Sequence, residues 1–300
     1  MKAIYTFLLL SLVPGVIFAA QPTGRYALAI EKMKELNKQH PDISQLINLG
    51  KNDEGVDIIG MRVSTTPRVI DNRKIGQLVV ATHHGNEGKS TTLALYFLAR
   101  LLRRFESGQL YTHNLGAMEW TIIPVLNVSG FNANSRHEHG VDPNRDYPGP
   151  CTSSPGGRLA SVRSLMNLLK VRTFAGAVTI HGYIGTLTFP WGVSTDNTHT
   201  HDHNFYASVV GKAAQLNGYR SGTSTDLIYS ATGTFEDYVY WKHGSWSLLV
   251  ELATGNSGDI EATAKSVEYF FNGIDSSPST KNQLTGSCTR QHRRPDLGIE

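Results

Sequence analysis

The chain has 300 residues, of which 40% are hydrophobic and 18% are charged, and its formal net charge is +3. This hydrophobic content can bury a full core, either as one large α/β domain or as two small ones. Lysine and arginine are scattered apart from one basic stretch near the end, RQHRRP, so the charge pattern does not indicate a nucleic-acid-binding protein.

The N-terminal segment is typical of a secretory signal. Lys2 supplies a positive start, residues 4–18 form an apolar stretch, and the small residues Ala19 and Ala20 follow it. The stretch is short for a bilayer span of about 20 residues and contains a proline and a glycine, which favours cleavage over a membrane anchor. We expect residues 1–20 to be removed and the mature protein to be exported, periplasmic or secreted, without stable membrane insertion.

Amphipathic helices alternate with buried apolar runs along the rest of the chain. The pattern predicts helices over 25–39, 90–105 (with Ser90 as its cap), 158–172, 204–216 and 260–272, and strands over 77–82, 119–127, 176–181 and 245–253. Such alternation favours a single-domain α/β sandwich, with a mixed, mostly parallel central sheet flanked by helices. We expect this domain to span residues 21–275. Residues 50–64 already read as part of it, which leaves no room for an inhibitory pro-segment.

Residues 276–300 read as a loosely held C-terminal tail. The chain has two cysteines, Cys151 and Cys288, and in an exported protein they permit one disulfide between this tail and the body of the domain. Two free thiols are the equally open alternative.

Polar side chains follow the strands at their carboxyl ends, where sites form in parallel sheets. His84 and Glu87 follow the first apolar run, His181 follows the run AVTI, and Glu251 follows SLLV. Two imidazoles and one carboxylate are the protein ligands of a catalytic zinc, which keeps a fourth position for water. Spacing alone does not select between His83 and His84 as the partner of Glu87.

Six blocks in order resemble the M14-type zinc metallocarboxypeptidases over most of residues 75–255: HGNE, NSRHEHG, GVDPNRDYP, TIHGYIGTLTFPWG, IYSATGT and LLVELA. The resemblance implies one zinc ion, held by His84, Glu87 and His181. It implies that Glu251 is the general base. Arg136 would stabilise the developing oxyanion, although its block is shorter than in the digestive members of the family.

The same resemblance implies how a substrate is recognised. Asn144 and Arg145 would bind the terminal carboxylate of a peptide, because a guanidinium pairs with a carboxylate through two parallel hydrogen bonds. Tyr229 would close over the bound residue. The position that sets the polarity of the side-chain pocket falls on Glu236, where an acid favours a cationic side chain. The open alternative is that Glu236 points into solvent and Asp237 has a structural role.

The histidine-rich stretch THTHDHNF favours a solvated surface loop over a second metal site. His199, His201 and His203 of this stretch are therefore not expected to be ligands, and neither are His83, His137, His139 and His243.

These residues favour a zinc-dependent carboxypeptidase that hydrolyses the C-terminal residue of peptides, including cell-wall stem peptides that an exported enzyme would meet. One alternative is an aspartoacylase-like amidohydrolase. The sequence HGNE suggests it, but the Pro-Trp-Gly block and the tyrosine loop argue against it. Another alternative is a catalytically silent binding module. The presence of Glu251 argues against it, because inactive relatives usually lose the general base.

Overall fold

The computed structural model describes residues 22–71, 73–108, 117–150, 152–193, 199–254 and 258–275. The expected signal segment (1–20), the tail (276–300), Cys151 and Cys288 lie outside these residues, so the predictions made for them stay predictions. No helix in the described part of the chain combines the length and the apolar character needed to cross a bilayer.

The described residues form a mixed sheet with the strand order β1-β2-β4-β3-β5-β8-β6-β7. Its central strands β4, β3, β5 and β8 are parallel to one another, as are β6 and β7, whereas β1, β2 and β6 each make an antiparallel pair with an inner neighbour. The predicted mixed, mostly parallel sheet is confirmed. The strand bounds are β1 Ser44–Lys51, β2 Asp57–Ser64, β3 Ile75–Ala81, β4 Met118–Ile123, β5 Gly176–Gly182, β6 Thr186–Phe189, β7 Arg220–Thr223 and β8 Trp246–Leu252.

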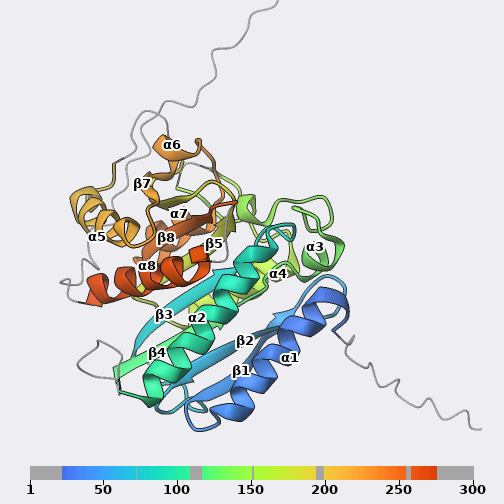
Figure 1. Cartoon of the computed structure of the whole chain (residues 1–300). Coiled ribbons are helices and arrows are strands. Elements are labelled where there is room, and N and C mark those ends of the chain that lie inside the picture. The colour runs from blue at the N-terminus through green and yellow to red at the C-terminus, as the bar shows by residue number, and fades with distance from the viewer. Residues whose placement is uncertain are drawn as a thin grey trace, which may run out of the picture.

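Helices cover both faces of this sheet, as predicted for an α/β sandwich. In Figure 1, α1, α2 and α8 lie across the near face, and α4 is seen behind the strands. The helix bounds are α1 Gly24–Gln39, α2 Gly88–Glu106, α3 Val128–Ala133, α4 Ala160–Val171, α5 His203–Gln215, α6 Ser224–Leu227, α7 Phe235–His243 and α8 Gly258–Asp275, with a short 3-10 helix, η2, at Pro143–Arg145.

The predicted elements are present, with two corrections at their ends. The strand expected over 119–127 ends at Ile123, because the chain then turns into α3. The cap expected at Ser90 is wrong, because α2 begins at Gly88 and Glu87 precedes it. Ser90 lies inside the first turn, where its hydroxyl donates to the Glu87 carbonyl at 2.6 Å.

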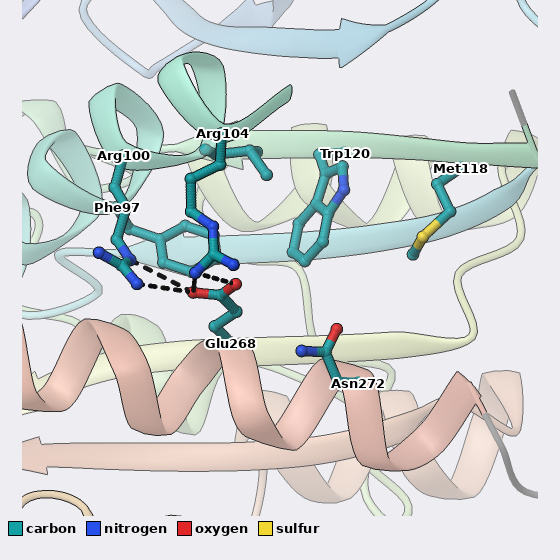
Figure 2. A pocket seen from close by; sticks show the side chains of 8 residues that line it. Phe97, Arg100, Arg104, Met118, Trp120, Glu268 and Asn272 are labelled. Atoms are coloured by element: carbon teal, nitrogen blue, oxygen red, sulfur yellow. Dashed lines mark hydrogen bonds and ion pairs between the residues drawn. The ribbon is translucent and has the colours of Figure 1, made fainter. Parts of the chain in front are cut away.

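A cluster of charged side chains joins α2 to α8. Figure 2 shows Arg100 and Arg104 of α2 both reaching Glu268 of α8, at 3.2 Å and 2.6 Å for the closest ion-pair contacts. Beside them, near Trp120 and Met118 of β4, lies a hollow of about 10 Å³. That volume holds about one water molecule, so the hollow is not a substrate site.

Candidate active site

Three adjacent strands bring the predicted site residues to one edge of the sheet. β3, β5 and β8 are parallel neighbours, so their carboxyl ends lie together. His181, near the end of β5, is the register partner of Glu251 on β8. His84 and Glu87 lie in the short connection from β3 to α2. The structure therefore places residues that are distant in sequence at a common edge.

His84, Glu87 and His181 form a buried donor set. The Nδ1 atoms of the two histidines lie 3.1 Å apart, and the Glu87 carboxylate lies 2.8 Å from Nδ1 of His84 and 3.1 Å from Nδ1 of His181. Two imidazole nitrogens that face each other this closely repel unless a proton or a cation lies between them. Two imidazoles and a carboxylate with inward-facing donor atoms fit a zinc ion.

Asp142 supports this set from the outer side. Its Oδ1 lies 3.0 Å from Nε2 of His84, and its Oδ2 accepts from Nε of Arg136 at 2.9 Å. Against the opposing effect of burial, the hydrogen bond from His84 and the charges of His84, Arg136 and Arg145 hold the pKa of Asp142 well below its usual range. A carboxylate that accepts from the outer nitrogen of a ligand histidine fixes the ring and the tautomer.

The loop that carries His84 and Glu87 lies directly against α3. A Cβ atom on Gly85 would lie 1.9 Å from the carbonyl carbon of Gly130, so only glycine permits this approach. Asn127, the N-cap of α3, joins the two segments. Its amide donates to the His83 carbonyl at 3.1 Å, and its side-chain oxygen accepts from the Gly130 amide at 2.7 Å.

A cavity of about 220 Å³ opens beside the donor set. Each residue that the sequence analysis assigned to catalysis, metal binding or substrate binding lines it: His84, Glu87, Arg136, Asn144, Arg145, His181, Tyr229, Glu236 and Glu251.

One wall of this cavity carries a guanidinium and a phenol. Nη2 of Arg145 donates to the Tyr229 hydroxyl at 2.9 Å, and the guanidinium lies 5.6 Å from the centre of the Tyr229 ring. Tyr229 is 53% exposed and stands at the rim. Asn144 is buried, and its side-chain oxygen accepts from the Phe235 amide at 2.8 Å. This contact ties the turn that carries Arg145 to the start of α7.

Glu251 faces the cavity with one carboxylate oxygen, Oε2, buried and without a hydrogen-bond partner among the described residues. Burial, and to a smaller extent the charge of Glu87, raise the pKa of Glu251 to about 8. A cation held by the donor set would act in the opposite direction, because it stabilises the ionised form. Glu251 is therefore a carboxyl group poised to exchange a proton.

A family model described as zinc carboxypeptidase matches residues 29–271. The chain belongs to the zinc carboxypeptidase family. It is 26% identical over 251 residues to a zinc carboxypeptidase of Simulium vittatum, covering 69% of this chain and 78% of that protein. It is 24% identical over 240 residues to carboxypeptidase SOL1 of Arabidopsis thaliana, covering 74% of this chain but only 48% of that protein.

Solved structures share the fold. The structure of carboxypeptidase A from Helicoverpa armigera aligns with a TM-score of 0.70 at 16% identity, over 86% of this chain and 74% of that one. The structure of thrombin-activatable fibrinolysis inhibitor aligns with a TM-score of 0.68 at 20% identity, over 83% of this chain and 72% of that one. The predicted α/β fold is thus shared with known carboxypeptidases.

The adjacent acids Glu236 and Asp237 of this zinc carboxypeptidase family member are both buried. Glu236 is 3% exposed and lines the cavity, and its Oε2 has no hydrogen-bond partner within the described ranges. Both oxygens of Asp237 accept from the Gly192 amide at 3.1 Å. The alternative in which Glu236 points into solvent is wrong, whereas Asp237 does hold structure.

Both ring nitrogens of His83 have partners outside the donor set. Its Nε2 lies 2.9 Å from the Tyr147 hydroxyl, and its Nδ1 lies 3.1 Å from Oγ1 of Thr179. The choice between His83 and His84 is therefore made by the direction of the ring nitrogens: Nδ1 of His84 faces Glu87 and His181, whereas neither nitrogen of His83 does. Asp142 and Thr179 received no role from sequence. Both lie inside quoted blocks, Asp142 in GVDPNRDYP and Thr179 at the start of TIHGYIGTLTFPWG, and that position was the only signal.

Among the described residues, one other group of His and acidic side chains is close enough to share an ion: Asp53, Glu138 and His139. Asp53 already accepts from the Ala160 amide at the start of α4, and both Asp53 and His139 are exposed. The histidine-rich stretch forms no such group in the described part, where His199 stacks on His203 with ring centres 3.6 Å apart.

Proposed function

We propose that this chain is a zinc-dependent metallocarboxypeptidase that removes the C-terminal residue of peptides. One observation carries the proposal: a single cavity is lined by a zinc-type donor set, by a glutamate with an unpartnered carboxylate oxygen, and by Arg145. Zinc held by His84, Glu87 and His181 would supply a Lewis acid that polarises the scissile carbonyl and makes water a better nucleophile at neutral pH.

The residues around the ion have separate tasks in this scheme. Glu251 takes a proton from the attacking water as the new carbon–oxygen bond forms, and passes it to the leaving amine as the carbon–nitrogen bond breaks. Arg136 donates hydrogen bonds to the negative charge that develops on the carbonyl oxygen. Its guanidinium is already oriented by Asp142 and lies 3.8 Å from Glu87 at its nearest atom.

Recognition of the chain end falls to Arg145 and Asn144. The guanidinium would exchange its hydrogen bond with the Tyr229 hydroxyl for a charge-assisted pair with the terminal carboxylate. Glu236 lines the same cavity and would pair with a cationic side chain, since no ion pair to it is found among the described residues. We therefore propose a preference for C-terminal residues with an amino or guanidino group.

The proposed location and physiological substrate rest on the sequence. We propose that residues 1–20 direct export, that residues 21–275 form the catalytic domain, and that 276–300 form a tail. Cell-wall stem peptides are then the proposed substrates, because an exported enzyme meets them. Mass spectrometry of a mixed peptide and muropeptide pool after incubation with the mature chain identifies the residue released, the bond cut and its stereochemistry.

Amidation of the substrate tests the carboxypeptidase assignment. Replacing the terminal carboxylate by an amide removes one charge-assisted pair and leaves the guanidinium unpaired, which typically costs about 2 to 5 kcal/mol, so kcat/KM should fall roughly 30-fold to several thousand-fold. Arg145→Ala should show a similar loss on the free acid and little further loss on the amide. Equal cleavage of acid and amide by the wild type would favour the amidohydrolase, and zinc binding without hydrolysis would favour the binding module.

A further inference from the structure

The outer nitrogen of His181 meets a buried threonine. Nε2 of His181 lies 3.1 Å from Oγ1 of Thr179, which is two residues earlier on β5 and shares its face of the sheet. Oγ1 of Thr179 also lies 3.1 Å from Nδ1 of His83, and Nε2 of His83 lies 2.9 Å from the Tyr147 hydroxyl. A continuous series of hydrogen bonds therefore runs from the donor set to Tyr147.

This series of hydrogen bonds is shielded from water. Thr179 and His83 are 0% exposed, and His181 and Tyr147 are 1% exposed. The ring of His83 also stacks on the ring of His181, with centres 5.4 Å apart and planes 15° from parallel. Buried polar groups without partners are costly, so an order of donors and acceptors that satisfies His181, Thr179 and His83 is strongly favoured.

Only one arrangement of hydrogens satisfies His181, Thr179 and His83 together when Nδ1 of His181 faces the ion. His181 then carries its hydrogen on Nε2 and donates it to Oγ1 of Thr179. The Thr179 hydroxyl has one hydrogen, which it donates to Nδ1 of His83. His83 in turn carries its hydrogen on Nε2 and donates it to Tyr147.

We propose that Thr179 and His83 are positioning residues that hold His181 in the ring orientation and tautomer required for zinc binding. The inference rests on the proposed function, because it takes His181 as a ligand. The two ligand histidines would then have unlike supports. His84 donates to the carboxylate of Asp142, whereas His181 donates to a neutral hydroxyl backed by a second imidazole.

Zinc affinity measured by competition with a chelating indicator tests the role of Thr179. Thr179→Val keeps the branched shape and removes the hydroxyl, and it should weaken zinc binding about 10- to 100-fold. Thr179→Ser restores the acceptor and should bind zinc like the wild type. Thr121→Val is the matched control, because Thr121 is a buried threonine of β4 away from the site, and it should leave zinc affinity unchanged. His83→Phe keeps the stacked ring and should give a loss smaller than that of Thr179→Val.

A spectroscopic readout separates positioning from packing. Nitrogen-15 NMR of the zinc-loaded wild type should show His83 protonated at Nε2 and bare at Nδ1, and this signature should be lost in Thr179→Val. Wild-type zinc affinity in Thr179→Val, or an equal loss in Thr121→Val, would overturn the proposal. Wild-type zinc affinity in His83→Phe would overturn the role proposed for His83. A wild type that binds no zinc would instead overturn the proposed function.

Discussion

The two ends of the central strands hold buried acids in opposite ways. At the amino ends, Glu119 of β4 is 1% exposed and forms ion pairs with Arg172 and with Arg62, the latter at 3.6 Å. Beside the carboxyl ends, Glu251 of β8 and Glu236 of α7 line one cavity and are 9% and 3% exposed, and no ion pair to either is found among the described residues. One buried acid is thus paired at the amino ends of the strands, whereas two buried acids beside the carboxyl ends are unpaired.

The difference separates structural charge from functional charge. Removing a carboxylate from water costs several kcal/mol, and at the amino ends two arginines offset much of that cost. At the carboxyl ends the acids face a cavity beside the donor set, where a metal ion, a proton or a cationic substrate group can act as the missing partner. Unpaired acids that share a cavity therefore indicate a site, and each prediction below tests this contrast.

The largest effect is expected for Glu251→Gln. Glutamine has nearly the same volume but cannot accept the proton of water, so kcat should fall about 100- to 10,000-fold while zinc content and folding are retained. Steady-state kinetics together with metal analysis measure both quantities. If the variant keeps near-native turnover, the general base lies elsewhere, and Glu236 becomes the next residue to test.

Glu119→Gln should affect stability rather than catalysis. Removing the acid leaves Arg172, itself 4% exposed on its side chain, without its buried counter-charge, and breaking such a pair typically costs about 3 to 5 kcal/mol. Urea unfolding measures the loss in the free energy of unfolding. The kcat/KM of the folded fraction should equal that of the wild type, and a parallel fall in kcat/KM would contradict the division between the two ends.

Glu138 tests whether burial and a raised pKa alone mark a functional acid. It is 0% exposed, outside the cavity, and burial raises its pKa from 4.5 to about 7. The folded state therefore keeps a proton that the unfolded state has lost between these two values, so stability falls as pH rises through this window and is constant above it. Glu138→Gln should remove this slope, which amounts to at most about 3 kcal/mol.

The measurement for Glu138 is the free energy of unfolding at pH 5 and pH 8 in the wild type and the variant. Other titrating groups cancel in the difference between the two proteins. Glu138→Gln should keep wild-type kcat/KM. A loss of activity at unchanged zinc content would show that this acid serves the site after all.

Glu236→Gln should change preference more than rate. Neutralising the acid removes the counter-charge for a cationic side chain, so kcat/KM for peptides ending in lysine or arginine should fall about 10- to 100-fold. Peptides with an apolar last residue should be cleaved as before. A uniform loss across both substrate types would indicate that Glu236 supports the fold of the cavity instead of reading the side chain.

The parts of the fold that the sequence predicts are those whose burial is regular. β3, β5 and β8 are buried along nearly their whole length and read as apolar runs, and α2 and α4 have clear apolar stripes. β6 and β7 have four residues each and carry no such run. α7 begins with buried Glu236 and Asp237, so its pattern does not resemble an amphipathic helix.

The site shows the same division. His84, Glu87, His181 and Glu251 were accessible from sequence because each follows or ends a strand in a recognisable block. The positioning roles proposed for Thr179 and His83 could not be predicted from sequence, since they depend on contacts between β5, the residues after β3 and the Tyr147 segment. Contacts between segments so far apart in the chain do not produce a recognisable residue spacing in the sequence.

The close approach of Gly85 to Gly130 limits how the loop that carries His84 and Glu87 could be used in protein design. Transplanting residues 82–87 onto another scaffold would bring two of the proposed ligands but not the surface that shapes their loop. Asn127 and α3 (Val128–Ala133) would have to be transferred with it, because they supply the backbone against which the loop rests. The smallest transferable unit is therefore two segments separated by some 40 residues of chain, not one contiguous peptide.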